Sequence, residues 1–263
     1  MSYFQNLDVF SWQIILLLLI AGFLTGVVNT FAGSGTAISY SVLIFLGIPI
    51  TTANGTIRMG VVLQTLAAAF TFYKKNTLNI RYGFLLAIPV TVGSVIGAQT
   101  AVTINKDVFE NIAASVMLIM LFFIVLKPEK WIKEQSDKVL QMPKIWHYLV
   151  YLVIGFYGGF IHIGVGIFLL AALVLLSGFN LLYANALKIF IVFIYSPFVL
   201  AVFMLNKQVD YSVGFIVSIG NLLGGIIASY YAVKKGANFI RWILILVLLI
   251  FSAQLFGFFE LFL

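Results

Sequence analysis

The chain has 263 residues, of which 63% are apolar and only 9% are charged, and its mean hydropathy is +1.14. Soluble domains are about 45 to 50% apolar and about 25% charged, so this composition excludes a soluble protein and predicts an all-α polytopic membrane protein. Continuous apolar runs exclude a β-barrel, whose strands alternate. The net charge of +7 is spread over short loops, which indicates membrane orientation rather than a nucleic-acid partner, and the lack of cysteine excludes disulfides and cysteine-bound metals.

Ten apolar segments follow one another along the chain, at residues 13–31, 36–46, 54–73, 82–102, 109–126, 145–163, 167–176, 183–205, 213–233 and 239–262. A helix rises 1.5 Å per residue, so the second and seventh segments cover only about 16 Å of a hydrocarbon core that is about 30 Å thick. We expect both to be half-helices that end inside the protein. The irregular backbone at Gly33-Ser34-Gly35 and Gly164-Val165-Gly166 should then face an internal cavity rather than lipid.

The second half of the chain repeats the first. Gly155, Gly159, His162 and Gly166 lie 133 residues after Gly22, Gly26, Asn29 and Gly33, and Gly178, Ala184, Asn185, Gly214 and Gly224 lie 131 residues after Gly47, Ala53, Asn54, Gly83 and Gly93. Each repeat holds five helical segments, one of them a short half-helix after a glycine break. Because five is odd, the second repeat should be inverted relative to the first. We expect one transmembrane repeat at 1–126, a linker at 127–144 and a second repeat at 145–263.

Basic residues are distributed unevenly between the two predicted membrane faces. On one face lie eleven of them (Lys74, Lys75, Arg81, Lys127, Lys130, Lys133, Lys138, Lys144, Lys234, Lys235 and Arg241), and on the other only Lys106 and Lys207. The richer face should be cytoplasmic. We therefore expect a multi-pass protein of the cell membrane, with the linker 127–144 as a cytoplasmic surface helix and both termini outside.

The carboxylates all lie in loops or at segment ends, at Asp8, Asp107, Glu110, Glu129, Glu134, Asp137, Asp210 and Glu260. This distribution argues against an intramembrane metalloprotease, a carboxylate proton relay and a cation channel with an acidic ring, and it predicts neither metal nor cofactor. The ionisable groups inside apolar sequence are Arg58, His162 and Lys188. All three can be positive, so the substrate should be an anion.

Arg58 and Lys188 lie four and five residues into the third and eighth segments, at nearly equivalent places in the repeats. Each segment follows a half-helix, so each cation should lie near mid-depth, where a charge costs about 2.5 to 3.5 kcal/mol or more and needs a partner. The alternative is that each side chain snorkels to the nearer interface.

The starts of the two half-helices offer further binding groups. Their backbone amides, at Ser34, Gly35 and Thr36 and at Gly166 and Ile167, should be unpaired donors at a positive dipole end, where glycine allows close approach of an oxyanion. Gly22, Gly26, Gly155 and Gly159 fit tight helix packing better.

Four polar residues occur in matched pairs. Asn54 and Asn185 stand in equivalent Ala-Asn dipeptides and could be helix N-caps, ligands or both. Asn29 and His162 precede the two breaks, and His162 could be either a satisfied core group or a proton-coupling residue.

Two stretches resemble a known family. GVVNTFAGSGTAISYSVLIFLGIPITTANGTIRMGVVLQ, with its glycine-rich break, Leu-Gly-hydrophobic-Pro turn and Ala-Asn-x-Thr-x-Arg segment, resembles the first signature of the sulfite exporter TauE/SafE family. IGFYGGFIHIGVGIFLL and YANALK look like its second signature. The resemblance implies a permease for small sulfur-containing anions or organic acids, and it places Asn54, Thr56, Arg58, Asn185 and Lys188 at motif positions. Two departures are GSG in place of a longer glycine run and His162 in place of a small residue.

The sequence thus predicts a secondary transporter that exports sulfite or a related small sulfur oxyanion or organosulfonate through a central cationic site, surrounded by membrane lipid. The predicted substrate contacts are Asn29, Gly33, Ser34, Gly35, Asn54, Thr56, Arg58, His162, Gly164, Gly166, Asn185 and Lys188. Import of a sulfonate or small carboxylate is the alternative, and an intramembrane enzyme is disfavoured. The coupling ion and the oligomeric state, including a homodimer, stay open.

Overall fold

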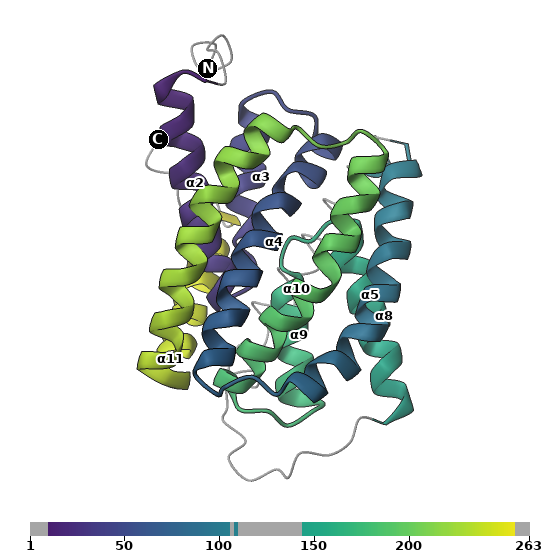
Figure 1. Ribbon diagram of the computed structural model, residues 1–263, viewed down its shortest axis with the longest axis vertical. Coiled ribbons are helices and arrows are strands. Elements are labelled where there is room, and N and C mark those ends of the chain that lie inside the picture. The colour runs from purple at the N-terminus through teal and green to yellow at the C-terminus, as the bar shows by residue number, and fades with distance from the viewer. Residues whose placement is uncertain (1–9, 106–107, 110–143, 256–263) are drawn as a thin grey trace.

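The computed structural model describes residues 10–105, 108–109 and 144–255, which form eight helices and no strands (Figure 1). The helices are α2 (Trp12–Phe31), α3 (Thr36–Phe45), α4 (Ile50–Lys74), α5 (Ile80–Thr103), α8 (Ile145–Phe160), α9 (Val165–Leu175), α10 (Leu181–Leu205) and α11 (Tyr211–Leu255). The all-α prediction is confirmed. The predicted fifth segment and the linker helix lie almost entirely outside the described residues.

Helix lengths separate membrane spans from half-helices. Among the described residues, α2, α4, α5, α10 and α11 are long and apolar enough to cross a membrane. The helices α3 and α9 have only 10 and 11 residues, which confirms their predicted half-length. Within α11 the backbone of Gly236 is not helical, with φ of 74° and ψ of −169°. This residue divides α11 into the two segments that the sequence predicts there.

The helices that carry the predicted cations begin earlier than their apolar patterns suggest. Pro49 precedes the first residue of α4, and the Asn180 side chain accepts a hydrogen bond from the Tyr183 amide at the start of α10. Asn54 and Asn185 therefore lie inside helices, and the prediction that they are N-caps is wrong. Arg58 and Lys188 lie about 12 Å and about 10 Å from the starts of their helices.

Glycines bring the helices of the two repeats into backbone contact. A Cβ atom on Gly22 of α2 would lie 2.3 Å from the Val217 carbonyl oxygen of α11, and one on Gly155 of α8 would lie 2.2 Å from that of Val90 in α5. Gly26 and Gly159 make the same kind of approach one turn further on. The packing role predicted for these glycines is confirmed, since each pair allows a close crossing of backbones.

The contact between α5 and α8 is equivalent to the contact between α2 and α11. The glycines that take equivalent places in the two contacts differ by one helical turn from the pairs that the sequence repeat gives. Gly93 meets Leu152 of α8, and Gly220 meets the equivalent Leu19 of α2. The sequence spacing instead pairs Gly93 with Gly224, which meets Phe23. The stretch from the first residue of the helix to this contact is four residues longer in α5 than in α11. The spacing of the sequence repeat alone therefore could not predict which glycines are equivalent.

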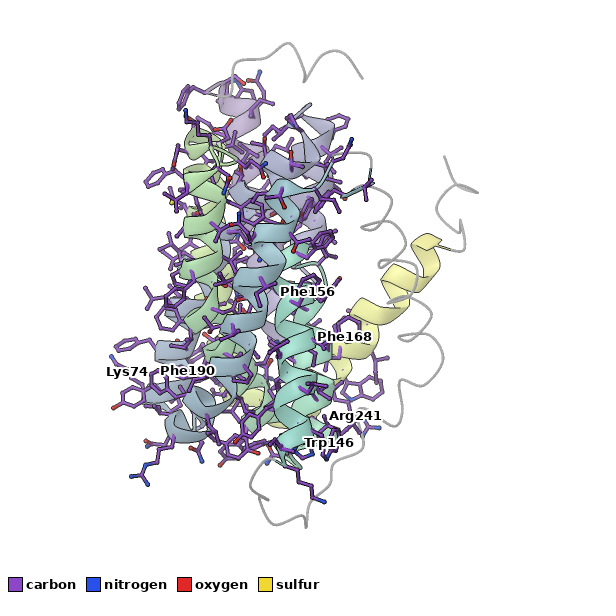
Figure 2. The ribbon with its side chains drawn as sticks, turned by 90° about the vertical axis from the view of Figure 1, so that its right-hand side faces the viewer. Lys74, Trp146, Phe156, Phe168, Phe190 and Arg241 are labelled. Atoms are coloured by element: carbon purple, nitrogen blue, oxygen red, sulfur yellow. The ribbon has the colours of Figure 1, made fainter. Side chains whose placement is uncertain are left out.

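The central helices α4 and α10 run in opposite directions. The start of α4 lies beside the end of α10, where a Cβ on Gly55 would meet the Gln208 carbonyl oxygen at 1.9 Å. The start of α5, which follows the end of α4, lies beside the start of α10, where Tyr82 packs against Phe179 with ring centroids 4.8 Å apart. Figure 2 shows Lys74, Trp146 and Arg241 in the lower part of the bundle, with Lys74 on the side opposite Trp146 and Arg241.

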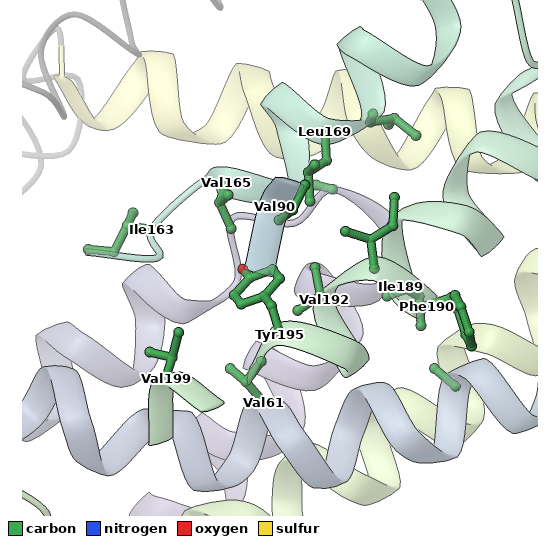
Figure 3. Close-up of a cluster of buried hydrophobic side chains, with 14 of the residues drawn as sticks. Val61, Val90, Ile163, Val165, Leu169, Ile189, Phe190, Val192, Tyr195 and Val199 are labelled. Atoms are coloured by element: carbon green, nitrogen blue, oxygen red, sulfur yellow. The ribbon is translucent and has the colours of Figure 1, made fainter. Parts of the chain in front are cut away.

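The two breaks meet in the middle of the bundle. A Cβ on Gly33 would lie 2.3 Å from Cα of Gly166, and the Gly166 amide donates to the Gly33 carbonyl oxygen at 3.3 Å. Figure 3 shows buried apolar side chains around the second break, among them Val61, Val165 and Val192. No side chain larger than hydrogen fits between the two breaks.

This contact predicts that Gly33→Ala destabilises the protein more than Gly47→Ala. Both glycines have positive φ, 79° and 85°, but a Cβ on Gly47 meets nothing within 4 Å. Gly47→Ala should cost about 1 to 2 kcal/mol for its left-handed backbone, whereas Gly33→Ala must also push two backbones apart. Thermal unfolding in detergent checks this, and equal losses for the two variants would contradict it.

Candidate functional site

Arg58 holds the C-terminal end of α8. Its side chain is 0% exposed, and its Nη1 and Nη2 donate to the carbonyl oxygens of Gly158 at 2.7 Å and Gly159 at 2.9 Å. Asn54, one turn earlier on α4, donates from Nδ2 to the next carbonyl, that of Phe160, at 2.8 Å. The last three carbonyls of α8 are therefore all bonded by side chains of the other repeat.

Lys188 does the same for α2. Its side chain is 1% exposed, and its Nζ donates to the carbonyl oxygens of Thr30 at 2.9 Å, Asn29 at 3.3 Å and Phe31 at 3.4 Å. The final carbonyls of a helix lack partners within it and form the negative end of its dipole, so a cation is favoured there. Each repeat thus caps the broken helix of the other, and the snorkelling alternative is wrong for both cations.

The donors of both cations are fully used by the protein. Arg58 also donates from Nε to the Asn54 carbonyl oxygen at 3.3 Å, from Nη2 to Asn54 Oδ1 at 3.1 Å, and from Nη1 to His162 Nδ1 at 3.2 Å. These bonds account for all five guanidinium N–H groups, and the three ammonium hydrogens of Lys188 have three carbonyls. In this conformation the cations supply positive potential but no free N–H group.

Asn54 and Asn185 differ in a way that the repeat did not predict. Asn54 uses both its amide nitrogen and its amide oxygen, as described above. Asn185 is 0% exposed, and neither Nδ2 nor Oδ1 has a hydrogen-bond partner. The reason is that Lys188 alone binds three carbonyls, whereas Arg58 binds two and needs Asn54 for the third.

His162 contacts Arg58 of α4 and Tyr195 of α10. Its backbone is left-handed, with φ of 65°, and its Nδ1 is 3.2 Å from Arg58 Nη1 and 3.1 Å from the Tyr195 hydroxyl. Nε2 is buried and has no hydrogen-bond partner in the described structure. This ring atom is therefore free to contact a ligand inside the protein.

The two breaks differ in their backbone amides. At the second break, Gly166 donates to Gly33 and Ile167 donates to Gly164 at 2.9 Å, so the prediction of unpaired amides there is wrong. That break also ends earlier than predicted, because α9 begins at Val165. At the first break, the described chain provides no acceptor for the amides of Ser34, Gly35 and Thr36, and the hydroxyls of Ser34 and Thr36 are also unpartnered.

Asn29 and Thr56 have structural partners. Asn29 Nδ2 donates to Gln64 Oε1 at 2.8 Å, and Gln64 Nε2 donates to Thr30 Oγ1 at 2.9 Å, which ties α2 to α4. Thr56 Oγ1 donates to the Thr52 carbonyl oxygen and accepts from the Asp210 amide at 2.9 Å, so it holds the α10–α11 loop. The Thr56 hydroxyl, which the sequence predicts as a substrate ligand, therefore contacts this loop.

Gln64 and Tyr195 also belong to this network, although the sequence did not identify them as site residues. Gln64 is 0% exposed within α4, and Tyr195 is 0% exposed within α10. A lone polar residue in an apolar segment was the available signal for Gln64. Tyr195 had none, because the chain has 12 tyrosines and most suit a membrane helix equally well.

Within the described residues, the site is electropositive and has no carboxylate beside its two cations. Asp210 is the acidic residue that the described ranges contain, and its Oδ1 accepts from the Val213 amide at the start of α11. The two buried cations are therefore held by neutral dipoles, and the start of α3 adds its positive dipole end. Such a constellation can attract and hold a small anion.

Membrane-length helices, two half-helices that meet at mid-bundle and buried polar groups at their breaks define a multi-pass membrane transporter rather than an enzyme. The profile described as Sulfite exporter TauE/SafE matches residues 18–255, and the chain belongs to this family.

Curated relatives agree with this class. The chain is 26% identical to "Probable membrane transporter protein ORF9" of Sinorhizobium sp over 93% of each chain. It is 26% identical to a "Probable membrane transporter protein" of Haemophilus influenzae over 92% of this chain and 94% of the relative. It is 24% identical to "Probable membrane transporter protein YfcA" of Escherichia coli over 97% and 94%. No solved structure gives a significant match.

The capping role of Lys188 predicts that Lys188→Met destabilises the folded protein. The change leaves three carbonyls without their donor, and each buried unsatisfied group costs about 1 to 3 kcal/mol. Lys207→Met, which removes a charge from an exposed turn, is the matched control and should change stability by less than about 0.5 kcal/mol. Thermal unfolding in detergent measures both, and equal stability of the two variants would rule out the capping role.

Proposed function

We propose that the protein is a secondary transporter that exports sulfite, or a related small sulfur oxyanion or organosulfonate, from the cell. Two findings support the substrate class. The chain belongs to the sulfite exporter TauE/SafE family, and its bundle buries Arg58 and Lys188 with no carboxylate near them in the described structure. The second finding carries the proposal, because it rests on this chain alone.

The charge of the two buried cations favours an anionic substrate. Each cation buried in the membrane costs about 2.5 to 3.5 kcal/mol or more. The carbonyls that bind Arg58 and Lys188 lower this cost but leave the net charge in place. A small anion at the breaks neutralises it, and a cation or a zwitterion with an ammonium group does not.

The predicted ligands could take different parts in binding the substrate. Arg58 and Lys188 supply the potential, and Asn29 and Asn54 position the helix ends. Gly33, Gly164 and Gly166 allow the turns and the close approach at the breaks. The groups left free for the substrate belong to Ser34, Gly35, His162 and Asn185.

The membrane potential suits export. A negative interior drives anion exit by about 2.3 kcal/mol per charge per 100 mV, so export requires no carboxylate relay for protons. The described membrane helices contain no carboxylate that could form one. The cationic site is consistent with simple anion exit along the electrical gradient.

We expect sulfite to be carried and taurine to bind far more weakly, because the taurine ammonium would meet Arg58 and Lys188. Proteoliposomes with purified protein test this by anion uptake, with sulfite, thiosulfate, sulfate, sulfoacetate and taurine compared at equal concentration. Liposomes without protein give the background. Equal competition by taurine and sulfite would overturn the anion site, and transport of none of the five would overturn the proposed substrate class.

The proposed topology places two inverted repeats in the cell membrane, with the 127–144 linker in the cytoplasm and both termini outside. Lys75 and Asn206 offer a matched test, since each follows the last residue of a central helix, with φ of −93° and −90°. The chain lacks native cysteine. An impermeant thiol reagent added to intact cells should label Asn206→Cys but not Lys75→Cys, and permeabilised cells should show both. External labelling of Lys75→Cys would contradict the orientation.

A further inference from the structure

The unpaired polar atoms of the site gather at the first break. Ser34 and Thr36 are buried there with free hydroxyls, and the amides of residues 34–36 have no acceptor in the described structure. At the second break the amides of Gly166 and Ile167 are bonded, whereas those of His162 and Gly164 and the Nε2 atom of His162 have no partner in the described structure. Three consecutive free amides and two free hydroxyls occur together at the start of α3, which therefore offers a ligand the larger group of polar atoms.

Asn185 completes this place from α10. It lies one turn before Lys188, and residues three apart share a helix face. The Lys188 ammonium contacts the last carbonyls of α2, directly before the first break. Asn185 therefore shares the face of α10 that carries Lys188, and its amide is fully buried with both polar atoms unpaired.

The free groups have a definite balance of donors and acceptors. The three amides can only donate, and so can the amide nitrogen of Asn185. The Asn185 oxygen can only accept, and exchanging the two amide atoms still leaves one of each. The hydroxyls of Ser34 and Thr36 are themselves unpartnered, so neither satisfies this oxygen.

From this balance we infer that the substrate, if it is the oxyanion proposed above, binds at the start of α3 as a monoanion that keeps an O–H group, such as hydrogensulfite. Its charged oxygens accept from the amides at residues 34–36, and its O–H donates to Asn185 Oδ1. A dianion such as sulfite offers acceptors alone. It would leave the buried Asn185 oxygen unpaired against a negative oxygen, which is costly in a membrane interior.

The test compares sulfite with methanesulfonate, a monoanion of similar shape that has no O–H and does not titrate near neutral pH. Equilibrium binding of both to the purified protein is measured over a pH series. The titratable side chains around the breaks are Lys188, Arg58, His162, Tyr40, Tyr157 and Tyr195. Their protonation affects both ligands, so the ratio of the two dissociation constants cancels much of it and reports the ligand's proton.

In the wild type, the apparent affinity for total sulfite should fall relative to that for methanesulfonate by about tenfold per pH unit, at pH values where most hydrogensulfite has lost its proton. The reason is that only the protonated fraction binds. A ratio that is flat or moves the other way overturns the inference and leaves the proposed function standing. Failure of both anions to bind would instead contradict the proposed function.

Asn185→Leu and Ser196→Ala give a matched pair of variants. Both remove an unpartnered buried polar group from α10, but only Asn185 lies on the turn before Lys188. Asn185→Leu should reduce the preference for hydrogensulfite over methanesulfonate by about tenfold or more. Ser196→Ala should leave the preference unchanged. An unchanged preference in Asn185→Leu would overturn the role of its amide, and the wild-type pH series decides the protonation state even if that variant does not fold.

Discussion

The structure depends on how two helix ends are satisfied inside a membrane. The helices α2 and α8 stop at Phe31 and Phe160, and their last carbonyls lack partners within the helix. Lys188 supplies all three donors at one end, and Arg58 with Asn54 supplies them at the other. Each donor comes from the other half of the chain, so the two helix ends are satisfied only when both halves are in place. The buried cations bond the helix ends at the breaks, and the positive potential of the site follows from their presence there.

The choice of lysine in one repeat and arginine in the other makes the site asymmetric. An ammonium with three hydrogens serves three carbonyls, whereas the planar guanidinium serves two and turns its remaining donors to Asn54 and His162. The equivalent asparagine is consequently occupied in the first repeat and free in the second. The unpaired polar groups are consequently distributed unevenly between the two breaks.

Much of this architecture follows from the sequence, because helix lengths, glycine breaks and charges inside apolar runs have clear physical costs. The half-length of α3 and α9 and the burial of Arg58 and Lys188 could be predicted on that basis. The partners of the cations could not, since a backbone carbonyl has no sequence signature. Asn54 was predicted at a helix start because polar residues in the first turns of α4 do not reveal that the helix begins at Ile50. The pairing of Gly166 with Gly33 depends on a contact 133 residues apart.

The meeting of Gly33 and Gly166 has a mechanical consequence. Side chains that interlock must repack when two surfaces rotate, and packed interfaces resist such movement. Between these glycines there is backbone only, joined by one long hydrogen bond of 3.3 Å. At this point the two halves of the chain therefore meet without interlocking side chains, whereas the close crossings of α2 with α11 and of α5 with α8 hold the same two halves together.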